Sequence, residues 1–100
     1  MTLDTQTHAE RKTTVEVTAN YLPSTEHYRE PFQRAQTLGD VRNQVMTFFN
    51  VSDHQDRDKH TFHLLFEGQQ RDDPGVALVT LVGDERHTAH FQLIERIQQG

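Results

Sequence analysis

The closing stretch of the sequence is the feature that most restricts what this chain can fold into. Two sets of side chains alternate along it: the apolar Phe91 and Leu93, and the opposite set His90, Gln92 and Ile94. Alternation with a period of two is typical of a strand with one buried face. The sequence therefore predicts a late strand that begins near Thr88 and ends at Ile94.

The residues after this strand are almost entirely polar. Among residues 95–100 only Ile97 is apolar, and the sequence stops on Gly100. A segment with so little apolar surface cannot bury itself against a core. We therefore expect residues 95–100 to form a flexible tail that holds the Gly100 carboxylate out in solvent.

Length and charge restrict the class of protein. One hundred residues suit one domain with a modest core, and the net charge is −5 with scattered basic residues, which disfavours nucleic-acid binding. The sequence has no cysteine, which excludes disulfides and thiolate catalysis. No apolar run approaches the ~18 residues of a membrane span, and the start lacks the pattern of a signal peptide. We expect a cytoplasmic protein that has no membrane partner.

The first half of the sequence predicts an arm and two strands. Residues 1–12 are polar and are expected to be disordered. β-branched residues dominate from Thr13 to Tyr21, where alternate side chains predict a strand. The run from Glu26 to Arg34 predicts a second strand, and because Pro31 cannot donate to a ladder, this strand should lie at a sheet edge.

A helix is predicted next. Thr37 is expected to be its N-cap, with the Asp40 carboxylate three residues on, and Asn50 a left-handed stop after Phe49. The apolar stripe of this helix consists of Leu38, Val41, Val45 and Phe48. Met46 and Phe49 lie beside the stripe and are expected to flank the core.

The second half of the sequence predicts a loop over residues 52–59 and a strand from His60 to Phe66. Phe62, Leu64 and Phe66 have core parity, whereas His63 and Leu65 point to the other face. Leu65 therefore needs either a cover or a binding partner. Three shorter features follow: a turn at Glu67–Gly68, a short strand within Gln69–Asp73, and an apolar run, Val76–Val82, that is either a short strand or a helical turn.

One helix inserted between a leading hairpin and later strands predicts an α+β domain in which the helix crosses one face of a mixed sheet. The chain resembles ubiquitin and its relatives. Three segments in register carry the resemblance: Thr37–Val41, Leu64–Gln70 and Thr88–Gly100. It extends from Thr13 to Gly100 and implies a ubiquitin-like β-grasp over residues 13–94, with a sheet of four to five strands and the last strand beside the first.

The resemblance also implies site residues. Gly100 falls at the terminal glycine through which such proteins are conjugated. Activating enzymes would read the tail residues before it, namely Arg96, Ile97, Gln98 and Gln99. The recognition patch of the family would consist of Leu65, Ile94, Gln92 and Gly68.

Three positions depart from the family pattern. Where the family usually has a glycine pair, this chain has Gln99-Gly100. Gln92 stands at the histidine position of the patch, and Gln69 stands at the lysine position after the glycine turn. The last departure argues against self-linked chains, since Lys12 and Lys59 are the only lysines. The chain looks most like the prokaryotic ubiquitin-like proteins encoded beside homologues of activating enzymes, conjugating enzymes and metal-dependent isopeptidases.

The function implied is that of a monomeric protein modifier in a bacterial, ubiquitination-like pathway, with antiphage defence as a candidate setting. Its partners would be the activating enzyme, the conjugating enzyme, a deconjugating peptidase and a target protein. The chain would be a substrate rather than an enzyme and would need no cofactor, because the activating enzyme uses the ATP. Two alternatives stay open: an interaction module that is never conjugated, and a sulfur carrier with a C-terminal thiocarboxylate.

Histidines invite a metal or acid–base interpretation. Two pairs were weighed, His60 with His63 and His87 with His90. A spacing of three residues places both rings on one face of a helix but on opposite faces of a strand. The acidic loop from Asp53 to Asp58 also lacks the spacing of a calcium loop. We therefore expect surface histidines and no metal site.

Overall fold

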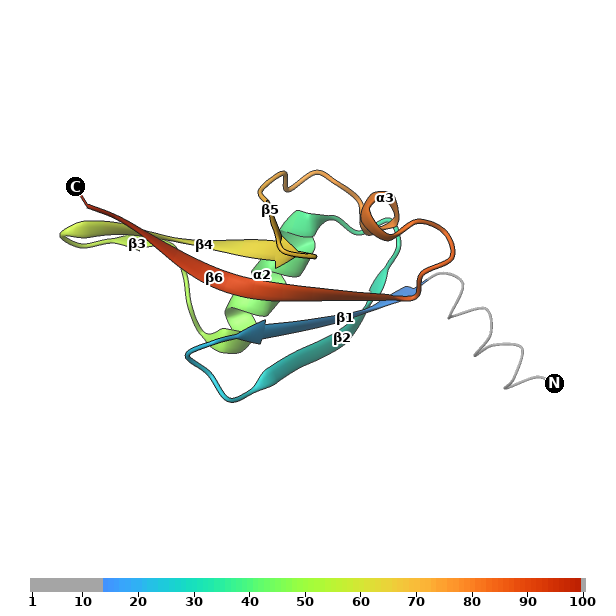
Figure 1. Ribbon diagram of the computed structural model, residues 1–100, viewed down its shortest axis with the longest axis horizontal. Helices are drawn as coiled ribbons and strands as arrows, with labels where there is room; N and C mark the ends of the chain where they lie inside the picture. Colours follow the sequence, from blue (N-terminus) through green and yellow to red (C-terminus); the bar gives the residue numbers. More distant parts are fainter. Residues whose placement is uncertain (1–13, 100) are drawn as a thin grey trace.

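The computed structural model describes residues 14–99, so the predicted arm over residues 1–12 and the terminal Gly100 lie outside the described part of the chain. Its elements in order are β1 (Thr14–Tyr21), β2 (His27–Gln33), α2 (Leu38–Phe49), β3 (His54–Gln55), β4 (Asp58–Phe66), β5 (Gln69–Arg71), α3 (Leu78–Val82) and β6 (Thr88–Gln99). The strands form one sheet in the order β2-β1-β6-β4-β3, with β5 paired to β4. Helix α2 crosses one face of this sheet (Figure 1).

Strand β6 lies at the centre of the sheet. It runs parallel to β1, with Glu16 opposite Thr88 and Tyr21 opposite Leu93, and antiparallel to β4. The first and last strands are therefore neighbours, as predicted. Strand β2 is the edge strand predicted from Pro31. The α+β class with one main helix is confirmed, and the sheet has six strands rather than four to five.

Helix α2 begins and ends where the sequence predicts. The Thr37 hydroxyl accepts a hydrogen bond from the Asp40 backbone N–H at 3.3 Å, and the Asp40 carboxylate accepts one from the Thr37 N–H at 3.2 Å. This reciprocal capping box satisfies two backbone donors that the first turn leaves free. Asn50 ends the helix in the left-handed conformation, with a φ of 58°.

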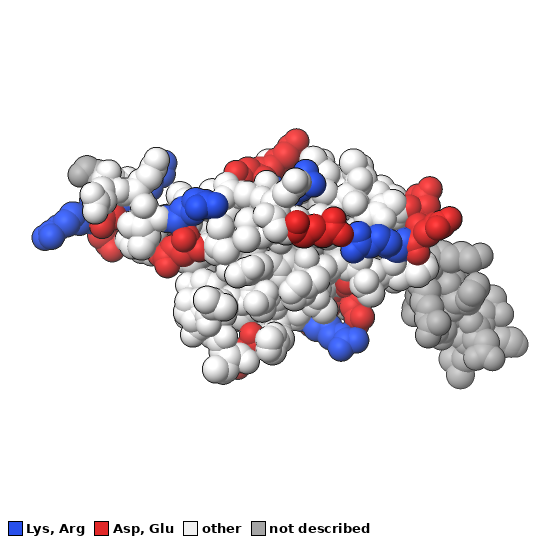
Figure 2. All heavy atoms as spheres, in the orientation of Figure 1, with Lys and Arg blue, Asp and Glu red and all other residues white. Residues whose placement is uncertain are grey.

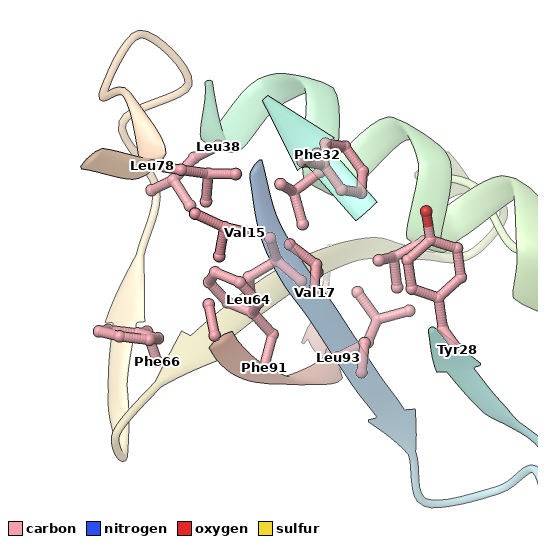
Figure 3. Packing of buried hydrophobic residues seen from close by; sticks show 14 of the residues in the cluster. Val15, Val17, Tyr28, Phe32, Leu38, Leu64, Phe66, Leu78, Phe91 and Leu93 are labelled. Atoms are coloured by element: carbon pink, nitrogen blue, oxygen red, sulfur yellow. The ribbon is translucent and has the colours of Figure 1, made fainter. Parts of the chain in front are cut away.

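The core lies between α2 and the inner face of the sheet (Figure 3). Leu38, Val41, Val45 and Met46 of α2 are buried there, and Phe49 packs against them. Phe48 was predicted in the stripe but is 42% exposed. Its ring lies over the edge strand, 5.3 Å from the Tyr28 ring. The prediction was wrong because Phe48 lies at the margin of the core, where its ring contacts the edge strand β2 and stays open to solvent.

The apolar run Val76–Val82 forms the short helix α3, which settles the alternative between strand and helical turn. Leu78 and Val82 are buried, and the segment before them lies against the start of α2. The Gly39 N–H donates to Pro74 O at 3.0 Å. A Cβ atom at Gly39 would lie only 3.1 Å from Pro74 Cβ and Pro74 O, so glycine permits this close approach.

Two predictions are wrong at one end of the sheet. The predicted loop over residues 52–59 contains β3 and the start of β4, which pair as a hairpin with His54 opposite His60. The predicted flexible tail is also a strand as far as Gln99, which lies opposite Asp58. The two errors have one cause: the hairpin lengthens β4 and provides backbone partners for residues 95–99. This ribbon extends beyond α2 (Figure 1).

Asp53 fastens this hairpin to the body of the protein. Its carboxylate accepts the Phe62 N–H at 2.8 Å and the Arg42 Nη2 at 2.7 Å. Burial alone would raise the pKa of Asp53, but the Phe62 N–H and the Arg42 guanidinium outweigh it and hold the pKa below its usual range. The folded state therefore favours the ionised carboxylate.

We expect the stabilising effect of Asp53 to disappear in acid. A lowered pKa in the folded state contributes stability above the unfolded pKa, near 4, and this contribution is lost as the pH falls through the folded pKa. Urea midpoints should therefore fall more steeply below about pH 4 for the wild type than for Asp53→Asn. Asp84→Asn removes one charge from an exposed turn and should keep the wild-type slope. Equal slopes for wild type and Asp53→Asn would contradict the assignment.

Candidate functional site

The outer face of the sheet, opposite α2, holds the residues that the sequence assigns to a recognition patch. Leu65 lies opposite Gln92 and Ile94 lies opposite His63, so the two apolar side chains occupy diagonal positions on adjacent strands. Both are half-buried rather than exposed. The apolar surface that they offer is therefore small.

A shallow depression of about 280 Å³ lies beside Leu65. It brings together three of the four predicted patch residues, Leu65, Gln92 and Gly68, whereas Ile94 lies outside its lining. Asn20, His90 and Arg86 also line it. His90 and Asn20 could have been added from strand parity, but Arg86 comes from a loop that sequence periodicity cannot place.

The rim of this depression is a tight turn. Glu67 and Gly68 both have positive φ, 53° and 82°, as a two-residue type I′ hairpin requires. Arg86 Nη1 donates to Glu67 Oε2 at 2.9 Å, and the guanidinium lies 5.6 Å from the centre of the Phe66 ring. These contacts hold a charged pair over the edge of the apolar core.

A chain of polar contacts connects Arg96 of β6 to β5 and β4 on the outer face. Arg96 Nε donates to Gln70 Oε1 at 2.7 Å, and Gln70 Nε2 donates to Asp72 Oδ2 at 2.6 Å. The other carboxylate oxygen of Asp72 lies 2.8 Å from His63 Nδ1. The Gln70 amide and then the His63 ring hold the pKa of Asp72 below its usual range. Arg96 is thus held against β5 instead of extending freely.

The remaining tail residues keep their side chains in solvent. Ile97, Gln98 and Gln99 are exposed, and Ile97 has 56% of its surface accessible. They are joined to β4 through backbone pairing. The sequence-predicted conjugation residue, Gly100, follows Gln99 directly but lies outside the described residues.

A second cluster lies on the inner face of the same ribbon, beyond the core. His54, His60 and Glu95 each offer a ligand atom, and these atoms lie within 4.8 Å of one another. The cluster differs from both histidine pairs that the sequence suggests: His60 and His63 lie on opposite faces of β4, and His87 contacts Arg34 Nη2 at 2.9 Å. Sequence reasoning missed it because residues 52–59 were interpreted as a loop, which left His54 without a strand partner.

Charges of both signs are interspersed on the visible face of the molecule, with no large area of one sign (Figure 2). Neither helix of residues 14–99 has the length and apolar character needed to cross a membrane.

Comparison with known proteins places the fold. No protein-family model matches the sequence, and neither does any curated protein. Among solved structures, Caldiarchaeum subterraneum ubiquitin is similar with a TM-score of 0.64 and 17% identity, over 87% of this chain and 99% of that one. The ubiquitin-like domain of an Arabidopsis thaliana protein aligns with a TM-score of 0.59 and 11% identity, over 82% and 77% of the two chains.

A ubiquitin-like protein from Trypanosoma brucei aligns with a TM-score of 0.54 and 19% identity, over 82% of this chain and 94% of that one. At identities this low, the shared feature is the fold. The chain therefore has the ubiquitin-like fold.

Proposed function

We propose that this chain is a protein modifier that is joined to target proteins through the carboxylate of Gly100. The observation that carries the proposal is the course of β6. This strand lies between β1 and β4 at the centre of the sheet, runs out of the core after Leu93, and continues with exposed side chains directly to Gly100. The residues before Gly100 are thereby anchored to the central strand of the sheet.

The chemistry would belong to partner enzymes. An activating enzyme would bring the Gly100 carboxylate to the α-phosphate of ATP, so that a carboxylate oxygen bonds to phosphorus and pyrophosphate leaves. A nucleophile would then attack the acyl carbon, and AMP would leave with the electron pair of the broken bond. Glycine suits both steps because the backbone must approach the reacting groups closely, and a Cβ would obstruct it. ATP is thus a substrate of the partner and not a cofactor of this chain.

The folded body would supply recognition. The depression beside Leu65 and the side chains of Arg96 and Gln98 share the outer face of the sheet by strand alternation, so one enzyme surface could contact them together. Arg96 offers fork-shaped donors to an acidic groove once it leaves Gln70. The activating enzyme, conjugating enzyme and deconjugating peptidase are the partners proposed, in the cytoplasm of a bacterium, and antiphage defence is the proposed setting.

The proposal can be tested by incubating the full chain with ATP and the activating and conjugating enzyme homologues encoded by neighbouring genes. We expect an ATP-dependent shift on a denaturing gel, with a mass that fits the chain joined to a second protein through an amide or ester bond. A shift that needs no ATP, or no shift with active enzymes, would contradict the proposal.

One observation favours a second candidate, an interaction module that is never conjugated. Residues 95–99 pair with β4 and are therefore already engaged in the sheet. A chain end held as a strand is less accessible to an enzyme channel than a free tail. In this case the outer face around Leu65 would bind a partner without ATP.

Leu65→Asp is expected to weaken binding to the activating enzyme at least about tenfold, which corresponds to about 1.4 kcal/mol. The new carboxylate would have to be desolvated beside Glu67 in the interface. The control Leu22→Asp makes the same change in an exposed turn where 80% of the residue's surface is accessible, and its binding should match the wild type. Titration calorimetry with the purified enzyme measures both. Equal affinities for the two variants would remove Leu65 from the interface.

A further inference from the structure

We propose that His54, His60 and Glu95 form a binding site for one zinc ion, which fastens the last residues of β6 to the β3–β4 hairpin. The three residues come from three neighbouring strands, β3, β4 and β6. This inference concerns the chain alone and does not depend on whether Gly100 is conjugated.

The donor set suits zinc. Two imidazoles and one carboxylate with a water in the fourth position form a tetrahedral site that Zn²⁺ commonly adopts. In such a site, ligand atoms 2.0–2.1 Å from the metal lie about 3.3 Å from one another. The three ligand atoms here lie within 4.8 Å of one another, and His60 Nδ1 is 2.7 Å from Glu95 Oε2. The His60–Glu95 contact is a hydrogen bond and is shorter than the ligand separation in a zinc site, so zinc would replace the shared proton as the side chains rotate to coordination distance.

Of the two rings, that of His54 is positioned by the backbone. His54 and His60 are opposite residues of the hairpin, and their rings stack with centroids 4.3 Å apart and planes 10° apart, so one ring must turn before both lone pairs reach the same ion. His54 Nδ1 lies 2.9 Å from the Ser52 carbonyl oxygen, which can only accept a hydrogen bond. Nδ1 therefore carries the proton and Nε2 carries the lone pair. Metal-binding histidines are commonly fixed in this way, by donating the other ring N–H to a backbone carbonyl.

The local charge also favours a cation. Glu95 is a partly buried carboxylate, with 29% of its side chain exposed, and Asp56 Oδ2 lies 3.9 Å from His54 Nε2. Neither acid forms an ion pair with a Lys or Arg side chain of residues 14–99. The site would thus bring two carboxylate charges and two imidazole nitrogens to a divalent ion.

Zinc binding is expected to restrict the last residues of β6. Glu95 follows Ile94 of the outer face. It is the first residue of the segment 95–99, which pairs with β4. An ion that joins Glu95 to both hairpin strands adds a cross-link to a segment that otherwise has backbone bonds on one side only. Zinc should therefore slow amide hydrogen exchange of residues 96–99.

The test is calorimetric titration of the full chain with zinc chloride. We expect one equivalent to bind, with the affinity lowered at least about tenfold in His54→Gln/His60→Gln. The control His63→Gln/His90→Gln removes the same number of imidazoles from the outer face and should bind like the wild type. Equal affinities for the two double variants, or no binding by the wild type at micromolar zinc, would overturn the proposal.

A measurement on the unaltered chain guards against a variant that fails to fold. In a zinc titration followed by NMR, the imidazole resonances of His54 and His60 should shift and saturate at one equivalent, while those of His63 and His90 stay in place. Shifts confined to the outer-face histidines would also overturn the proposal.

Discussion

Phe91→Ala is expected to lower the free energy of unfolding by about 3 to 5 kcal/mol. Phe91 is fully buried on the central strand, and its ring centre lies 5.3 Å from that of Phe66 on β4 (Figure 3). Truncation removes the transfer free energy of the ring and leaves a cavity that strands paired on both sides of β6 cannot close. Urea denaturation followed by circular dichroism measures the loss, which would consume much of the ~5–15 kcal/mol available to a domain of this size.

Phe48→Ala is the matched control. It removes the same ring from a position that the helix stripe predicts as core but that is 42% exposed. The remaining contacts are edge-on to Tyr28 and Phe49, with ring centres 5.3 and 4.9 Å away. We expect a loss of about 1 kcal/mol from these aromatic contacts. A larger loss from Phe48→Ala than from Phe91→Ala would contradict the core assignment.

The sequence predicted the elements whose signals are local. The capping box of Thr37 and Asp40 and the left-handed Asn50 define the ends of α2 within a few residues of chain. Alternation in β1 and β6 placed Val15, Val17, Phe91 and Leu93 on the core face, where they are buried. Pro31 similarly assigned β2 to an edge. Each of these features depends on nearby side chains and needs no knowledge of the rest of the fold.

The features that the sequence missed depend on tertiary pairing. Residues 54–59 are polar and carry no alternation, yet they belong to a hairpin that Asp53 holds through the Phe62 N–H and Arg42. Residues 95–99 are polar too, and they are a strand only because this hairpin lies beside them. The histidine cluster with Glu95 requires both pairings at once. Composition alone therefore predicted a loop over residues 52–59 and a flexible tail over residues 95–100.

The pairing of residues 95–99 bears directly on the proposed function. An activating enzyme would have to separate these residues from β4 before Gly100 could enter a narrow channel. The separation costs backbone hydrogen bonds, each worth about 0.5 to 1.5 kcal/mol net. Little apolar burial is lost, because Ile97 is the one apolar residue of segment 95–99 and 56% of its surface is already exposed. Contacts with the enzyme can offset a cost of this size, so a paired chain end and activation at Gly100 are compatible.

Deleting Gly100 is expected to reduce adenylation at least about 100-fold while leaving the fold intact. The deletion shortens the chain by one residue and places a side chain on the reacting carboxylate, and misplacement of a reacting group by about 1 Å costs on this order in rate. The fold should persist because the core lies within residues 15–93. Single-turnover adenylation with the activating enzyme measures the rate, and a thermal melt checks the fold.

Gln99→Ala is the matched control for this deletion. It alters the neighbouring exposed residue but keeps the chain length and Gly100. Its adenylation rate should stay within about threefold of the wild type, because the Gln99 side chain is expected to contribute under about 1 kcal/mol to stabilising the transition state. If the chain without Gly100 were adenylated as fast as the wild type, the carboxylate of Gly100 would not be the reacting group. The better explanation would then be an interaction module that binds its partner through the face around Leu65. In that case the pairing of residues 95–99 with β4 would be a permanent part of the sheet rather than a barrier to activation.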